Sequence, residues 1–163
     1  FDMTELIREV IRKTSVMLEG QNIKVKFEAK EPVYVYADEF YIEQVITNYV
    51  TNAIKHVEER NKDILIEIRI EKRENGKARI YVYNTGTPIS EENQNRIWNR
   101  FYKIDTSRNR EKGGTGIGLS LVKAIMNNYK NAYGVYNRDN GVEFYFDLDY
   151  IEKSKGEDDE NIN

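Results

Sequence analysis

Residues 113–122 read GGTGIGLSLV, and this stretch is the most informative in the chain. Four glycines fall within residues 113–118 and lead directly into an apolar, periodic segment that continues to Met126. Such a loop delivers the N-terminus of a helix, where unpaired backbone N–H groups and the helix dipole favour an anion. Glycine also lets the main chain approach a phosphate, because no Cβ stands in the way. The stretch therefore predicts a phosphate group at the start of a helix.

Two common nucleotide-binding loops do not match this stretch. A dinucleotide-binding fingerprint lies between the first strand and its helix, whereas these glycines lie past residue 110 and follow a charged loop. A Walker A loop ends in Gly-Lys-Ser/Thr, but Gly118 is followed by Leu119. Taken alone, the glycines favour a plain turn before an ordinary helix over a nucleotide site. The loop indicates a nucleotide and leaves the family open.

The composition fits one domain with a single core. Of the 163 residues, 39% are hydrophobic, and 25 basic against 28 acidic residues give a net charge of −3, so nucleic acid is not an expected partner. The absence of cysteine and the single histidine, His56, exclude disulfides, thiolate sites and multi-histidine metal sites. No apolar run approaches the ~18 residues of a membrane span, so we expect no direct membrane contact.

The ends of the chain carry two further expectations. Because the first residue is Phe1 and not methionine, we expect the chain to be a piece of a longer protein. Residues 151–163 are polar and acidic, which predicts a disordered tail after a single domain over residues 1–150.

Apolar periodicity predicts helices interspersed with strands. The helices are expected at about 3–18, 39–59, 91–98 and 117–129. The strands are expected at 23–27 and 33–36, and in two hairpins at 64–70 with 78–83 and 133–136 with 142–148. Residues 102–116 are too polar and glycine-rich to pack, which predicts a mobile lid. Because these elements alternate without βαβ regularity, the pattern predicts an α+β fold, a two-layer α/β sandwich.

The helix expected over residues 39–59 carries a polar stripe beside its apolar face. Asn48, Asn52 and Lys55 fall within a narrow arc at ~100° per residue. Asparagine is a mediocre helix former, so two asparagines one turn apart neither favour the helix nor contribute to the hydrophobic core. Their amide oxygens are suited to Mg²⁺, and Lys55 is suited to meeting a phosphate as a point charge. A solvated helix face explains the stripe equally well.

A third polar motif follows the strand expected over residues 78–83. The chain continues as Asn84-Thr85-Gly86-Thr87-Pro88-Ile89, which can place a polar side chain on the floor of a pocket or form a plain turn.

With this motif in place, the chain resembles the catalytic, ATP-binding domain of sensor histidine kinases, in the family shared with gyrase, the Hsp90 chaperones and the mismatch-repair ATPases. Residues 42–57 resemble the N box, 84–89 the first glycine box, 98–102 the F box and 114–118 the second glycine box, in the family's order. The resemblance covers residues 1–150. It implies a Bergerat-type ATP-binding fold, with a mixed, mostly antiparallel sheet and helices on one face.

The resemblance implies ATP and Mg²⁺ as ligands and assigns roles by position. Asn52 is similar to the asparagine that holds Mg²⁺, with Asn48 as a second candidate ligand, and Lys55 matches a phosphate-side lysine. Asn84 occupies the place of an aspartate that accepts the adenine amino proton. The other residues implied to bind ATP are His56, Gly86, Ile89, Phe101 (which would anchor the lid), Lys103, Gly114, Thr115, Gly116, Ile117, Gly118 and Leu119.

Two departures from the family pattern bear on function. The first glycine box is usually Asp-x-Gly-x-Gly, and here Asn84 and Pro88 replace its ends. An amide still accepts a hydrogen bond but loses the charge-assisted part, so weaker or less selective adenine binding is a hypothesis. Hydrolytic relatives use a glutamate at the place of Asn48, and an amide cannot act as a general base. The resemblance therefore favours phosphoryl transfer over hydrolysis.

The expected function is transfer of the γ-phosphate of Mg-ATP to a histidine on a dimerisation domain outside this chain, for relay to a response regulator aspartate. No catalytic residue is then expected in the chain itself, which would bind ATP with little turnover. The fragment is expected to be a monomer, and the full-length protein a homodimer whose cytoplasmic domain belongs to a membrane-anchored sensor. Two alternatives stay open: an anti-sigma-type serine kinase and a non-catalytic nucleotide-binding module.

Overall fold

The computed structural model describes residues 1–102 and 118–152. Its strands are β1 (Lys24–Phe27), β2 (Tyr34–Tyr36), β3 (Leu65–Lys72), β4 (Lys77–Thr85), β5 (Tyr133–Arg138) and β6 (Gly141–Ile151). Its helices are α1 (Met3–Thr14), the 3₁₀ helix η1 (Ser15–Leu18), α2 (Glu39–His56), α3 (Glu91–Arg96) and α5 (Gly118–Tyr129).

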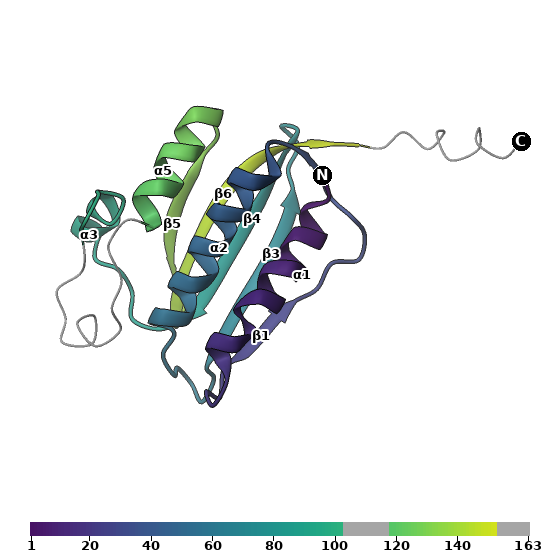
Figure 1. Cartoon of the computed structure of the whole chain (residues 1–163). Coiled ribbons are helices and arrows are strands. Elements are labelled where there is room, and N and C mark those ends of the chain that lie inside the picture. Colours follow the sequence, from purple (N-terminus) through teal and green to yellow (C-terminus); the bar gives the residue numbers. More distant parts are fainter. Residues whose placement is uncertain (103–117, 153–163) are drawn as a thin grey trace, which may run out of the picture.

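The strands form one mixed sheet, and the helices form a second layer. The six strands follow the order β1-β3-β4-β6-β2, with β5 also paired to β6. β1 runs parallel to β3, and the other strand pairs are antiparallel. Helices α1, α2 and α5 lie over the same face of the sheet (Figure 1). The expected two-layer α+β sandwich with a mostly antiparallel sheet is confirmed.

Most expected elements are present, with differences at their ends. Asp2 and Asp38 cap α1 and α2 by accepting hydrogen bonds from the backbone N–H groups of Thr4 and Phe40, each at 2.9 Å. The first helix is α-helical only to Thr14 and continues as η1, and α2 ends at residue 56 instead of 59. β6 reaches residue 151 because its last residues pair with β2. The expected lid and acidic tail lie almost entirely outside the described residues.

Helix α2 supplies the centre of the core. Four of its side chains are fully buried against the sheet: Ile42, Val45, Ile46 and Tyr49. The phenol of Tyr49 donates a hydrogen bond to the carbonyl oxygen of Tyr145 on β6, at 3.0 Å. Burying each of the aliphatic side chains, Ile42, Val45 and Ile46, stabilises the fold by about 1.5–3 kcal/mol. This burial fixes the rotation of α2 about its axis, and with it the direction of the polar stripe.

The opposite face of the sheet is polar and forms its own ion pairs. Arg79 forms two hydrogen bonds with Asp147, at 2.6 and 2.9 Å, and its guanidinium lies 4.2 Å from the ring centre of Tyr145. Burial, with a hydrogen bond to Tyr136, raises the pKa of Tyr145 to about 12. Glu143 of β6 is buried, and its carboxylate accepts hydrogen bonds from Arg69 on β3 and Arg138 on β5. These charges are paired with one another, whereas Asn84 of β4 lies on the helix-covered face with the buried side chains of Ile80 and Val82.

Gly141 of β6 leaves no space for a Cβ against β4. A Cβ there would lie 2.2 Å from the backbone oxygen of Asn84 and 2.6 Å from the ring of Tyr83. Backbone cannot move aside, so we expect Gly141→Ala to lower the free energy of unfolding by about 2–3 kcal/mol. The measurement is urea denaturation followed by circular dichroism.

Gly134→Ala is the matched control on the neighbouring strand. The three atoms nearest to a Cβ at Gly134 would belong to the ring end of the Tyr145 side chain, at 2.6–2.8 Å, and a side chain can turn away. We expect less than half of the loss seen for Gly141→Ala. Equal losses would contradict the close backbone approach at Gly141.

Candidate functional site

The polar stripe of α2 meets the start of α5. Asn48, Asn52 and Lys55 are half-buried on one flank of α2. A Cβ at Gly118, the first residue of α5, would lie 2.8 Å from the Oδ1 atom of Asn48. Glycine is therefore what lets the end of the second glycine box rest against the N box. The structure thus brings two of the predicted motifs, 70 positions apart, into contact.

Asn84 lies at the end of β4, on the helix-covered face. It is 3% exposed and pairs with Val142 of β6 and Ile66 of β3 in the sheet register. Its Nδ2 donates a hydrogen bond to the carbonyl oxygen of Thr85, at 3.1 Å. This bond fixes the amide so that Oδ1, the acceptor atom, is the end turned away from that carbonyl.

Gly86 joins the end of β4 to the end of α2. A Cβ at this position would lie 3.1 Å from the carbonyl oxygen of His56 and 3.4 Å from the Nδ2 atom of Asn84. The N–H of Gly86 donates to the carbonyl oxygen of Asn140 in the β5–β6 turn, at 2.9 Å. The first glycine box is thus held between the last residue of α2 and this turn. The side chain of His56 is exposed at the same end of α2.

Asn137 of β5 holds the far end of the first glycine box. Its Oδ1 accepts a hydrogen bond from the N–H of Ile89 at 2.9 Å, and its Nδ2 donates to the carbonyl oxygen of Ile89 at 2.8 Å. The side chain of Gln94 donates to the same carbonyl at 3.0 Å. Sequence reasoning missed Asn137, because an exposed asparagine on a strand gives no sign of a partner 48 positions away.

The F box is anchored by its tryptophan in the described part of the chain. Trp98 is 8% exposed, donates from Nε1 to the carbonyl oxygen of Gln94 at 3.0 Å, and packs edge-on against Tyr133 at 4.9 Å between ring centres. Phe101, the expected anchor of the lid, is 62% exposed and has a positive φ of 63°. Its role toward the lid stays a prediction, because the lid lies outside the described residues.

Of the other residues predicted in the lid and second glycine box, those from residue 118 onward lie in the described part of the chain. Leu119 is half-buried and packs against the core from α5. Five predicted site residues lie outside the described part of the chain: Lys103, Gly114, Thr115, Gly116 and Ile117.

The predicted metal ligands of the site are the amide oxygens of Asn48 and Asn52. In residues 1–102 and 118–152, no group of three histidine, cysteine or acidic side chains is placed to hold a metal ion. Mg²⁺ accepts oxygen ligands and keeps several waters while it binds phosphates, so the two asparagines of the α2 stripe suit it without such a group. Over the same ranges, no helix has the length and apolar character needed to cross a membrane.

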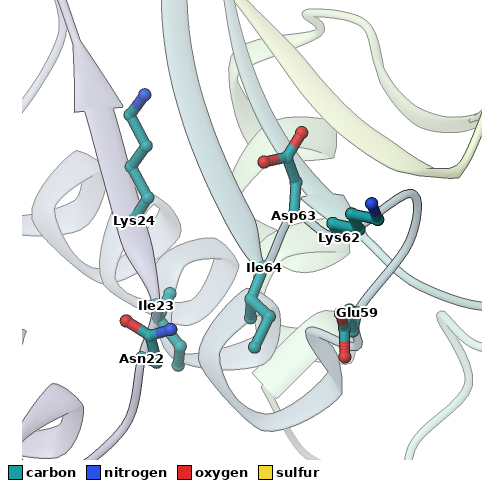
Figure 2. Close-up of a pocket in the computed structure, with 7 residues that line it drawn as sticks. All are labelled: Asn22, Ile23, Lys24, Glu59, Lys62, Asp63 and Ile64. Atoms are coloured by element: carbon teal, nitrogen blue, oxygen red, sulfur yellow. The ribbon is translucent and has the colours of Figure 1, made fainter.

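A separate hollow of about 310 Å³ lies between the loop that follows α2 and the start of β1. Its lining residues are Asn22, Ile23, Lys24, Glu59, Lys62, Asp63 and Ile64. Figure 2 shows the charged ends of Lys24, Lys62 and Glu59 pointing in different directions instead of converging on one point. None of the predicted site residues lines it, so we place the candidate site at the α2 flank.

Comparison with known proteins agrees with this geometry. Residues 37–151 match the family described as histidine kinase-, DNA gyrase B- and HSP90-like ATPase. The chain belongs to this family. The matched range includes α2, β4 and α5, the three elements that meet at the site.

Solved structures and curated relatives narrow the likeness to sensor histidine kinases. The catalytic domain of the histidine kinase ThkA is 34% identical with a TM-score of 0.77, over 91% of this chain and 93% of that one. A structure of ThkA in complex with the response regulator TrrA is 30% identical with a TM-score of 0.69, over 91% and 40% of the two chains. The sensor protein RprX of Bacteroides fragilis is 34% identical over 131 residues, which are 79% of this chain and 25% of RprX.

The chain is thus a histidine-kinase-type ATPase domain. It spans 14% of the length of the signal transduction histidine-protein kinase BarA of Escherichia coli and 35% of that of the sensor-like histidine kinase SenX3 of Mycolicibacterium smegmatis.

Proposed function

We propose that the chain binds Mg-ATP between the flank of α2, the end of β4 and the start of α5. The contact between Asn48 and Gly118 carries this proposal, because it places the N box against the start of a helix that follows the second glycine box. Gly86 and Asn84 lie at the C-terminal end of α2, beside His56. Three motifs that are distant in sequence therefore surround one half of α2.

Each described residue has a role suited to its chemistry. Asn52, with Asn48 one turn earlier, would hold Mg²⁺ through amide oxygens, and Lys55 would meet a phosphate. Bound Mg²⁺ neutralises charge on the phosphates. Asn84 would accept a hydrogen bond at Oδ1 from the exocyclic amine of adenine. The first N–H groups of a helix have no partner within the helix, so the N-terminus of α5 suits the phosphate end of the nucleotide.

We further propose that the γ-phosphate goes to a histidine on a separate helical domain of the parent protein. Asn48 supports transfer over hydrolysis, because its amide cannot take a proton from water near neutral pH. We also propose a homodimeric, membrane-anchored parent protein whose cytoplasmic part holds this domain, with a response regulator as the next acceptor. The structure of ThkA in complex with the response regulator TrrA supports the last of these steps. Catalysis would then depend on positioning and charge neutralisation around the γ-phosphate.

Replacing Asn52 tests the nucleotide site. We expect Asn52→Ala to weaken Mg-ATP binding at least tenfold, since a metal ligand is lost, and to change ATP binding in EDTA less than twofold. Isothermal titration calorimetry gives both constants. Asn128→Ala, an exposed asparagine on α5, is the matched control and should bind like the wild type. Equal loss with and without Mg²⁺ would contradict a ligand role for Asn52.

Labelled ATP and the full-length protein test the transfer. We expect label to be incorporated as an acid-labile, base-stable phosphohistidine outside this domain, while the isolated domain binds ATP with little turnover. Acid-stable phosphoserine on an added protein would point instead to a serine kinase. ATP binding without any transfer would indicate a non-catalytic nucleotide-binding module.

A further inference from the structure

The loop after α2, which contains no predicted site residue, forms hydrogen bonds with the first glycine box. The N–H of Glu58 donates a hydrogen bond to the carbonyl oxygen of Thr85, at 2.8 Å. The same carbonyl accepts the Nδ2–H of Asn84, at 3.1 Å. The atom that orients the Asn84 amide is therefore itself held in place by the backbone of residue 58.

Side chains add a second connection between the same two segments. The carboxylate of Glu58 accepts hydrogen bonds from the Thr87 hydroxyl at 3.2 Å and from Nη2 of Arg60 at 3.4 Å. Nη2 of Arg60 also donates to the Thr87 hydroxyl oxygen, at 3.0 Å. Glu58 thus binds residue 85 through its backbone and residue 87 through its carboxylate. Gly86, whose φ of 155° is one that side chains rarely allow, lies between these two attachments.

A tight turn fixes the loop that carries Arg60. Arg60 and Asp63 exchange two backbone hydrogen bonds, each 2.9 Å long. Asn61 and Lys62 between them both have positive φ, 49° and 67°, as the two central residues of a type I′ turn do. Nη1 of Arg60 also donates to the carbonyl oxygen of Glu59, at 2.9 Å. The guanidinium is therefore presented to Thr87 from a short turn whose backbone is closed on itself.

We propose that Glu58, Arg60 and Thr87 are positioning residues that set the base selectivity of the nucleotide site. Their side chains bond residues 58 and 60 to residue 87, and so hold the backbone N–H of Glu58 against the Thr85 carbonyl oxygen. This carbonyl keeps the amide of Asn84 turned so that Oδ1 faces the base. The proposal rests on the proposed function, because it requires a nucleotide base at Asn84.

Orientation matters here because an amide, unlike a carboxylate, has two different ends. With Oδ1 toward the base, Asn84 accepts a hydrogen bond from the 6-amino group of adenine. The 6-oxo group of guanine is itself an acceptor, so it forms no hydrogen bond with Oδ1. A turned amide would offer Nδ2 instead and bond to guanine. Selectivity therefore depends on what prevents the turn, and the described structure supplies the Thr85 carbonyl for this purpose.

The test compares Mg-ATP with Mg-GTP on the same set of variants. We expect the wild type to prefer ATP at least tenfold. Thr87→Val and Glu58→Ala should weaken ATP binding about threefold to tenfold and leave GTP binding unchanged or stronger, so that the preference falls at least fivefold. Thr87→Ser keeps the hydroxyl and should restore the preference. Arg8→Met removes an exposed ion pair with Glu5 on α1 and should change neither constant.

The possible failures are distinguishable from one another. A wild type that binds Mg-ATP without preferring it to Mg-GTP would overturn the selectivity proposal alone. So would equal weakening of both nucleotides in Thr87→Val, since a purely structural role moves them together. A wild type that binds no Mg-ATP would overturn the proposed function as well. If urea denaturation shows Glu58→Ala to be unfolded, the pair Thr87→Val and Thr87→Ser decides the question by itself.

Discussion

The hydrogen bond from the Glu58 N–H to the Thr85 carbonyl oxygen, at 2.8 Å, joins the end of α2 to the end of β4. The rest of the site depends on this junction. Tyr49 and its buried neighbours fix the rotation of α2, so the polar stripe has one direction in space. With the helix end tied to β4, the stripe and Asn84 are held at a constant separation. A nucleotide could then be bound at its phosphate end and its base end by one rigid frame.

Two further contacts complete this frame from other parts of the chain. Gly118 rests against Asn48 and places the start of α5 beside the stripe. Asn137 on β5 holds both backbone groups of Ile89, so the first glycine box is attached to the sheet at its far end as well. Glycine allows two of these close approaches, because an added Cβ would lie 3.1 Å from the carbonyl oxygen of His56 at Gly86 and 2.8 Å from Oδ1 of Asn48 at Gly118.

Much of the fold could be predicted because its causes are local. Apolar periodicity and the capping aspartates placed the helices, and the two stripe asparagines were conspicuous because helices rarely favour them. The parallel pairing of β1 with β3 and the attachment of Ile89 by Asn137 depend on partners far away in sequence. Glu58 and Arg60 could not be recognised either, because charged residues after a helix look solvated until Thr87, 27 to 29 positions on, is brought beside them.

The most direct test of the account is a map of amide chemical shifts in the isotope-labelled domain during titration with Mg-ATP. We expect the largest changes at Asn48, Asn52, Gly86 and Gly118, where α2, β4 and α5 meet, and none at Asn22 or Lys24 in the hollow of Figure 2. Changes that cluster around Asn22 and Lys24, with the flank of α2 unaffected, would contradict it.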